Sequence, residues 1–65
     1  MNIMKYFIVY NGQYMTSRKS VKSAIKEIEK RGYKNSEDNI CYIQDEDGNL
    51  WSTEGEPVED YDSIC

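Results

Sequence analysis

Residues 17–33, with the sequence SRKSVKSAIKEIEKRGY, have the hydrophobic spacing of an amphipathic α-helix. Four apolar side chains recur at positions i, i+3, i+4 and i+7, which places them on one side of a helix. They are Val21, Ala24, Ile25 and Ile28. Four lysines gather on a neighbouring side, and they are Lys19, Lys22, Lys26 and Lys30. The rest of the chain must therefore supply a sheet that covers the apolar side.

Capping preferences indicate where this helix begins and ends. Thr16 or Ser17 is expected at the N-cap, where its hydroxyl oxygen can accept a hydrogen bond from a free backbone N–H. Gly32 is expected in the left-handed conformation just beyond the last turn, with Tyr33 packing back on Ile28 in a Schellman motif.

A β-hairpin is predicted before the helix. Residues 4–10, MKYFIVY, favour a strand, and Asn11-Gly12 favours a two-residue type I′ turn because both turn positions need a positive φ. Residues 13–16 return as the second strand, which places Ile8 opposite Met15 and Phe7 opposite Thr16. Alternation gives one face with Phe7, Val9 and Tyr14, and another with Tyr6, Ile8, Tyr10 and Met15. Both faces are partly apolar, and we expect Phe7 and Val9 to face the helix.

A second hairpin is predicted after the helix. Residues 40–44 form its first strand and residues 49–53 its second, with Gly48 in the left-handed conformation of a turn that carries a G1 bulge. This register places Ile43 opposite Trp51 and leaves Cys41 on the same face. The predicted fold class is α+β with the order ββαββ, in which two antiparallel hairpins form a four-stranded sheet with one helix packed on one face. Residues 1–53 form this single domain. Gly55 and Pro57 are expected to end its last strand, and residues 54–65 form an acidic C-terminal tail.

Charge is divided between the two halves of the chain. Residues 1–36 contain all eight basic residues and two acidic ones, whereas residues 37–65 contain ten acidic residues and no base. Three of the cations, Arg18, Lys19 and Lys22, lie near the helix N-terminus, where positive charge is unfavourable by a few tenths of a kcal/mol. Either the two halves neutralise each other in the fold, or one face meets a charged partner.

Length and composition exclude several classes of protein. A chain of 65 residues forms one small domain, and no apolar run approaches the roughly 20 residues that span a bilayer. The first residues lack the features of a signal peptide, so we expect a cytoplasmic protein in which Cys41 and Cys65 are reduced. In an oxidising compartment, these two cysteines would instead form a disulfide that holds the tail.

The residue types argue against catalysis. The chain has no histidine, its two cysteines form no metal-binding or redox motif, and no phosphate-binding or nucleophile motif is present. The carboxylates of residues 45–47 lie on an exposed turn in this reading, and the segment DEDGN lacks the remaining ligands of a calcium loop. We therefore expect no enzyme activity, no cofactor and no metal site.

The acidic half gives the first functional hypothesis, in which a negative surface binds a basic, nucleic-acid-binding host protein. The clusters EDN, DEDG and EGEPVEDYD, together with the small size, make the chain similar in type to phage-encoded inhibitors of host nucleic-acid machinery, such as anti-CRISPR proteins and uracil-DNA glycosylase inhibitors. That resemblance implies a cytoplasmic inhibitor or accessory protein, with nucleic-acid mimicry as its means. The candidate residues are Glu37, Asp38, Asp45, Glu46, Asp47, Glu54, Glu56, Glu59, Asp60 and Asp62.

The basic half gives the alternative, direct binding of nucleic acid through phosphate contacts. The candidate residues are Arg18, Lys19, Lys22, Lys26, Lys30 and Lys34, with Tyr10 or Tyr14 stacking on bases. The net charge of −4 opposes this hypothesis. Head-to-tail self-association through oppositely charged faces is a further alternative, and Tyr6 and Tyr10 become the candidates if neither charged surface binds.

Overall fold

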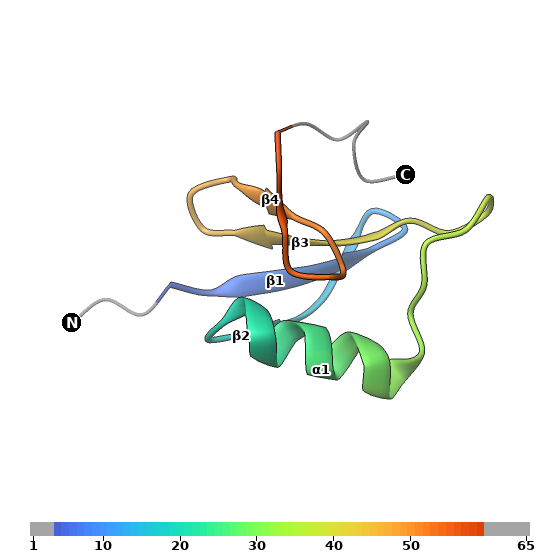
Figure 1. Ribbon diagram of the computed structural model, residues 1–65, viewed down its shortest axis with the longest axis horizontal. Coiled ribbons are helices and arrows are strands. Elements are labelled where there is room, and N and C mark those ends of the chain that lie inside the picture. The colour runs from blue at the N-terminus through green and yellow to red at the C-terminus, as the bar shows by residue number, and fades with distance from the viewer. Residues whose placement is uncertain (1–3, 60–65) are drawn as a thin grey trace.

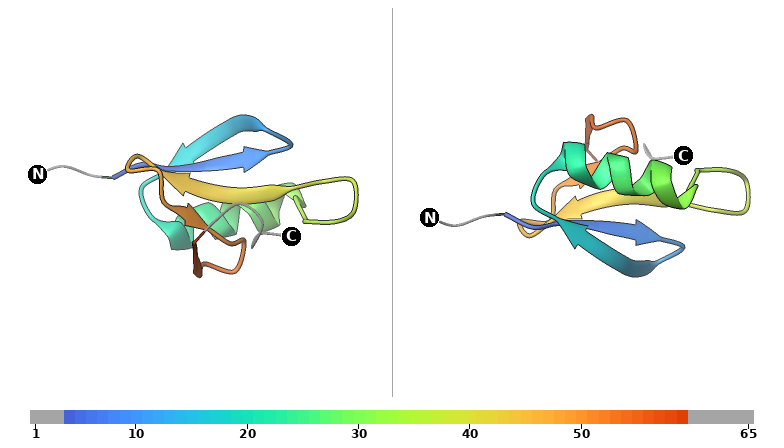
Figure 2. Two further views of the ribbon diagram at one scale, coloured as in Figure 1. Left: turned by 90° about the horizontal axis from the view of Figure 1, so that it is seen from above. Right: turned by 90° about the horizontal axis from the view of Figure 1, so that it is seen from below.

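The chain folds as a five-stranded antiparallel sheet with one helix against one of its faces (Figure 1). The computed structural model describes residues 4–59. The elements are β1 (Tyr6–Tyr10), β2 (Gln13–Arg18), α1 (Val21–Arg31), β3 (Cys41–Asp45), β4 (Leu50–Trp51) and β5 (Pro57–Val58). Their order across the sheet is β2-β1-β3-β4-β5. Figure 2 shows α1 behind the sheet from one side and in front of it from the other. The predicted α+β class and the single helix on one face are confirmed.

The fifth strand corrects the predicted four-stranded sheet. β5 pairs with β4, so that Leu50 lies opposite Val58 and Trp51 opposite Pro57. We expected Gly55 and Pro57 to end the sheet, but Gly55 instead occupies the left-handed position of a tight turn, with φ +92°. The residues that follow therefore return along β4. Residues 60–65 of the predicted tail lie outside the described residues.

Two successive turns of this sheet have the same construction. In the β3–β4 turn the N–H of Gly48 donates to the carbonyl of Asp45 at 3.0 Å, and in the β4–β5 turn the N–H of Gly55 donates to that of Ser52 at 3.0 Å. The side chains of Asp45 and Ser52 each accept hydrogen bonds from the backbone N–H groups two and four residues later. The first turn is the one predicted from sequence. The second repeats its pattern seven residues later, with STEGE in place of DEDGN.

The equivalence of the two turns gives a matched pair of substitutions. Gly48→Ala should cost about 1 kcal/mol, because alanine resists the left-handed conformation and nothing else lies within 4 Å of the added Cβ. Gly55→Ala should cost about 1 kcal/mol more, because its Cβ would lie 2.8 Å from Cδ1 of Ile25. Urea unfolding measures both losses. Equal losses of stability would contradict the close contact between residue 55 and α1. In an Ile25→Val background, which lacks Cδ1, the losses caused by the two glycine substitutions should be more similar.

The first hairpin has the predicted turn but a different register. Asn11 and Gly12 both have positive φ, and Tyr10 lies opposite Gln13 as expected. A β-bulge then intervenes, so that Ile8 lies opposite Thr16 and not Met15. The bulge adds one residue to the second strand, and pairing continues to the end of β2.

The longer second strand moves the start of the helix. Ser20, and not Thr16 or Ser17, is the N-cap, and its side chain accepts a hydrogen bond from the N–H of Ser23 at 3.1 Å. The other end is confirmed. Gly32 has φ +75° and donates to the carbonyl of Glu29, and the N–H of Tyr33 donates to that of Ile28, as a Schellman motif requires.

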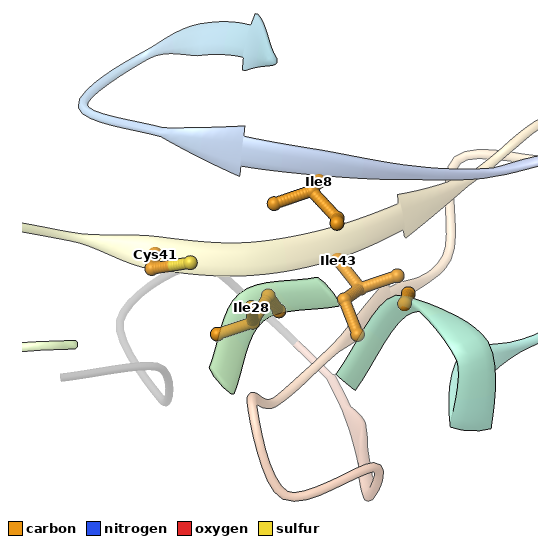
Figure 3. Close-up of a cluster of buried hydrophobic side chains, with 5 residues drawn as sticks. Ile8, Ile28, Cys41 and Ile43 are labelled. Carbon is orange, nitrogen blue, oxygen red and sulfur yellow. The ribbon is translucent and has the colours of Figure 1, made fainter. Parts of the chain in front are cut away.

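The core lies between α1 and the face of the sheet that carries Ile8. Ile8, Cys41 and Ile43 point from β1 and β3 toward Ile28 of the helix, and all three are fully buried (Figure 3). The expectation that Phe7 and Val9 face the helix was wrong. Pairing of β1 with β3 places Ile8 beside Ile43, so this row forms the larger continuous apolar surface.

Aromatic side chains close both ends of this core. Tyr10 stacks on Tyr33 with ring centroids 4.3 Å apart, and Tyr6 meets Trp51 edge to face at 6.2 Å. All four pack against the buried cluster. Tyr6 and Tyr10, which were the fallback candidates for an exposed binding surface, therefore contribute mainly to packing.

Candidate functional site

The predicted acidic residues lie in three places around the sheet. One group is in the loop between α1 and β3, a second is in the β3–β4 turn at the opposite end of the molecule, and a third surrounds β5 (Figure 1). The groups are Glu37 and Asp38; Asp45, Glu46 and Asp47; and Glu54, Glu56 and Glu59. Asp60 and Asp62 lie outside the described residues. The carboxylates therefore do not form a single cluster.

The acidic half is not neutralised by the basic half within the described residues. Both ion pairs found among residues 4–59 involve Glu27, which meets Arg18 at 2.9 Å and Arg31 at 2.5 Å. The side-chain hydrogen bonds from Arg31 and Arg18 hold the pKa of Glu27 below its usual value. All three residues belong to the first half of the chain. The exposed carboxylates of residues 37–59 thus have no counter-ion in this part of the chain, although Oε1 of Glu46 accepts the backbone N–H of Lys5 at 2.7 Å.

Asp45 is the exception, because its carboxylate holds the β3–β4 turn together. The residue is 5% exposed. One oxygen accepts the backbone N–H groups of Asp47 and Asn49, each at 2.9 Å, and the other accepts the side-chain N–H groups of Asn49 and Trp51. Burial raises the pKa of Asp45, but the hydrogen bonds from Asn49, Trp51 and Asp47 outweigh burial and lower it overall. Asp45 is therefore a structural residue.

The predicted basic residues divide in a similar way. Arg18 is held by Glu27 and also donates to the side chain of Thr16 at 2.8 Å and to the carbonyl of Ser17. The five predicted lysines are exposed, and none of them forms an ion pair within the described part of the chain. They are Lys19, Lys22, Lys26, Lys30 and Lys34.

The sheet face that points away from α1 is called here the open face. Its exposure was not predicted from the sequence. The strand register places eight side chains on it. They are Phe7, Val9, Tyr14, Ser17, Tyr42, Gln44, Leu50 and Val58. None of these side chains is charged, although 31% of the chain is.

Tyr14 is the most prominent residue of the open face, with 64% of its surface exposed. Its ring stacks on Phe7 with centroids 5.4 Å apart and planes inclined by 16°. Its hydroxyl donates to Oε1 of Gln44 at 2.9 Å, across the intervening strand β1. Val9, opposite Tyr14 in the register, is only 1% exposed. The tyrosine is therefore both accessible and held in position.

The described residues offer little for catalysis or metal binding. Within residues 4–59 no group of three His, Cys, Asp or Glu side chains is placed to hold a metal ion. Burial raises the pKa of the Cys41 thiol to about 11, which leaves it protonated and unreactive near neutral pH. An open hollow lies between Lys34 and Glu54, but the side chains of Asn35 and Ser52 that line it already accept backbone hydrogen bonds.

Comparisons with known proteins add no family to these observations. The chain matched no protein-family model, no curated protein and no solved structure. Among the described residues no helix is both long enough and apolar enough to cross a membrane.

Proposed function

We propose that this protein is a small protein-binding module, an inhibitor or accessory protein, that engages a basic, nucleic-acid-binding protein through its open face. The observation that carries the proposal is a neutral aromatic surface flanked by carboxylates that have no counter-ion within residues 4–59. The surface supplies the area that a partner can cover. The negatively charged carboxylates favour a partner with a positively charged surface.

The composition of the open face is that of an interface centre. The centres of protein interfaces are depleted of charged residues and enriched in aromatic ones, and a few aromatic anchors contribute most of the binding energy. Tyr14 has the features of such an anchor because its ring is exposed while Phe7 and Gln44 fix its orientation. Little rotamer entropy then remains to be lost on binding.

The acidic α1–β3 loop and β3–β4 turn, at the two ends of the sheet, favour binding of a basic protein. Glu37 and Asp38 lie at one end, and Glu46 and Asp47 at the other (Figure 1). A basic protein would be attracted over a distance of about one Debye length, which raises the rate of association. A nucleic-acid-binding groove has this basic character, and covering it would block its access to phosphate.

The same features argue against nucleic acid as the ligand of the open face. Proteins that stack bases on aromatic side chains combine them with Lys or Arg that follow the backbone. The open face has no basic side chain, and the carboxylates at its ends would repel phosphates.

Affinity capture followed by kinetics on the captured protein tests the proposal. Nuclease-treated lysate is passed over the purified chain, and the retained protein is then measured against variants. Tyr14→Ser should raise the dissociation rate about tenfold, as expected for an interface anchor. The combined variant Glu37→Gln, Asp38→Asn, Glu46→Gln and Asp47→Asn should lower the association rate about tenfold and reduce its dependence on salt.

The matched control is the triple variant Lys22→Gln, Lys26→Gln and Lys30→Gln, which lies on the other side of the molecule. It should leave the dissociation rate unchanged, and it should not lower the association rate, because loss of positive charge cannot weaken the attraction to a basic partner. Competition by excess duplex DNA should release the partner if the acidic turns occupy its nucleic-acid site. Unchanged rates for both test variants would refute the proposal, as would a retained protein that lacks a basic surface.

A further inference from the structure

We infer that α1 carries a second binding surface, for the phosphate backbone of a nucleic acid, on the side of the molecule away from the open face. This inference goes beyond the proposed function and uses different residues. Its centre is the lysine row, defined as Lys22, Lys26 and Lys30. The helix lies against the other face of the sheet (Figure 2), so the two surfaces can be occupied at the same time.

The lysine row is regular and exposed. Its members recur every four residues on a helix, which separates them by about 6 Å along the axis. All three are exposed, and within residues 4–59 none of them has an ion-pair partner. Lys19 and Lys34 are also exposed and lie just before the N-cap and just after Gly32 in the chain, but Lys34 borders the hollow that Glu54 and Glu56 also line.

The arrangement of the helix carboxylates keeps the row basic. Glu27 lies on the other flank of α1, where both of its oxygens are taken by Arg18 and Arg31. It therefore neutralises the arginines and leaves the lysines free. The helix has one other carboxylate, that of Glu29, whereas the row contains three lysines.

The lysines at the start of the helix are unfavourable for the helix itself. The first turn contains no acidic residue, and Lys19 and Lys22 stand at the positive end of the helix dipole. Local stability would favour carboxylates there. Positions that depart from local preference are often functional, which supports a role for these cations outside folding.

The chemistry of this side favours a nucleic acid over a protein. The exposed residues of α1 are Lys22, Ser23, Lys26, Glu29, Lys30 and Arg31. None of them is apolar, so a protein partner, including a second copy of this chain, would find no centre from which to exclude water. A phosphate backbone needs only cations and the release of its own counterions. The α1–β3 loop and the β3–β4 turn lie at the level of the sheet (Figure 1), whereas the acidic β4–β5 turn packs against α1 at Ile25, outside the lysine row.

Fluorescence anisotropy with labelled oligonucleotides tests this inference with purified protein alone. The probes are a 20-nucleotide oligo-dT and a 20-base-pair duplex, titrated between 20 and 200 mM salt. The wild-type chain should bind both weakly, in the range of about 10⁻⁴ to 10⁻⁶ M. The triple variant Lys22→Gln, Lys26→Gln and Lys30→Gln should lower the affinity at least tenfold, and it should reduce the single-strand salt slope by about 2.

A pair of single substitutions separates a local site from a general effect of charge. Lys26→Gln and Lys5→Gln each remove one exposed lysine, but Lys5 precedes β1 and lies off the helix. Lys26→Gln should reduce the salt slope by about 0.7, and Lys5→Gln should leave it unchanged. Equal effects of the two variants, or no binding by the wild-type chain at 20 mM salt, would overturn the inference.

Self-association is measured in the same samples by sedimentation. Oligomers that disappear in the triple variant would assign the lysine row to a second copy of the chain and overturn the inference. The partner measurements of the proposed function use Tyr14 and the acidic turns. Failure of one proposal therefore leaves the other testable.

Discussion

Ile43→Ala is expected to remove much or all of the stability of the domain at room temperature. Ile43 is fully buried between Ile8 of β1 and Trp51 of β4, and it belongs to the cluster that contacts the helix. Truncation of a buried isoleucine to alanine costs about 2–5 kcal/mol. A domain of this size has a total stability of about 3–10 kcal/mol, so the loss removes much or all of it. Circular dichroism and urea unfolding measure the result.

Phe7→Ala is the matched comparison for this prediction. It removes a larger side chain, but one that lies half-buried on the open face, so the expected loss is about 1–2 kcal/mol. The comparison tests which face of the sheet the helix covers. If Phe7→Ala destabilises the domain more than Ile43→Ala does, the helix covers the face that carries Phe7.

Asp45→Asn is expected to cost about 2–3 kcal/mol, although it is nearly isosteric. The oxygen that accepts from Nε1 of Trp51 at 3.3 Å and from Nδ2 of Asn49 at 3.2 Å becomes an NH₂ group, which cannot accept. Two donors then lose a charged partner in a buried position. Asp47→Asn is the control because it removes the same charge from an exposed position two residues away, and it should be nearly neutral.

Ser52→Ala extends this comparison to the equivalent turn. The Ser52 hydroxyl accepts backbone N–H groups from Glu54 and Glu56, each at 3.2 Å, but it is uncharged. The expected loss is about 1 kcal/mol. Urea unfolding of Asp45→Asn, Asp47→Asn and Ser52→Ala under the same conditions ranks their losses of stability. If Ser52→Ala costs as much as Asp45→Asn, the charge of Asp45 does not account for the larger effect expected there.

The Asp45 network also predicts a dependence on acid. Because the folded state lowers the pKa of Asp45, its contribution is complete above the usual carboxyl pKa of about 3.9 and is lost as the pH falls through the lower, folded value. Stability should therefore decline below about pH 4. Asp45→Asn should show a shallower decline than the wild-type chain. Parallel curves would show that other carboxylates, such as Glu27, account for acid sensitivity.

Local patterns predicted the elements whose geometry depends on neighbouring residues. The C-terminal cap at Gly32 and the turn at Gly48 follow from backbone conformations that glycine favours, and both were confirmed. The register of Ile43 opposite Trp51 follows from that turn. The β4–β5 turn has the same sequence signal, but Pro57 led us to end the sheet too early.

The first hairpin could not be resolved by local patterns. Its two faces are similarly apolar, and the choice between them depends on Ile43 and Cys41, which lie more than thirty residues further along the chain. The bulge at Met15 changes the register in the middle of a strand, and no turn residue marks it. The exposure of Tyr14 follows from this choice of face, so the open face was missed for the same reason.

The division of charge between the two halves of the chain could be read from the sequence, but the contacts that individual charged side chains make in the fold could not. Composition could not show that Asp45 is buried in a hydrogen-bond network or that Glu27 holds two arginines. Both facts depend on which residues meet across a turn or between β2 and α1. The structure thus removes Asp45 and Arg18 from the surfaces open to a partner and leaves the other described candidates accessible.

The two outer strands of the sheet limit how this molecule can associate. An exposed edge strand can pair with a strand from another chain, which leads to strand addition or fibres. At the β2 edge, the bulge at Met15 interrupts the regular spacing of backbone donors and acceptors. At the β5 edge, the strand is two residues long and one of them is Pro57, which has no N–H to donate. Both edges are therefore poorly suited to pairing with a strand of another chain, which favours association through side chains on the faces of the molecule.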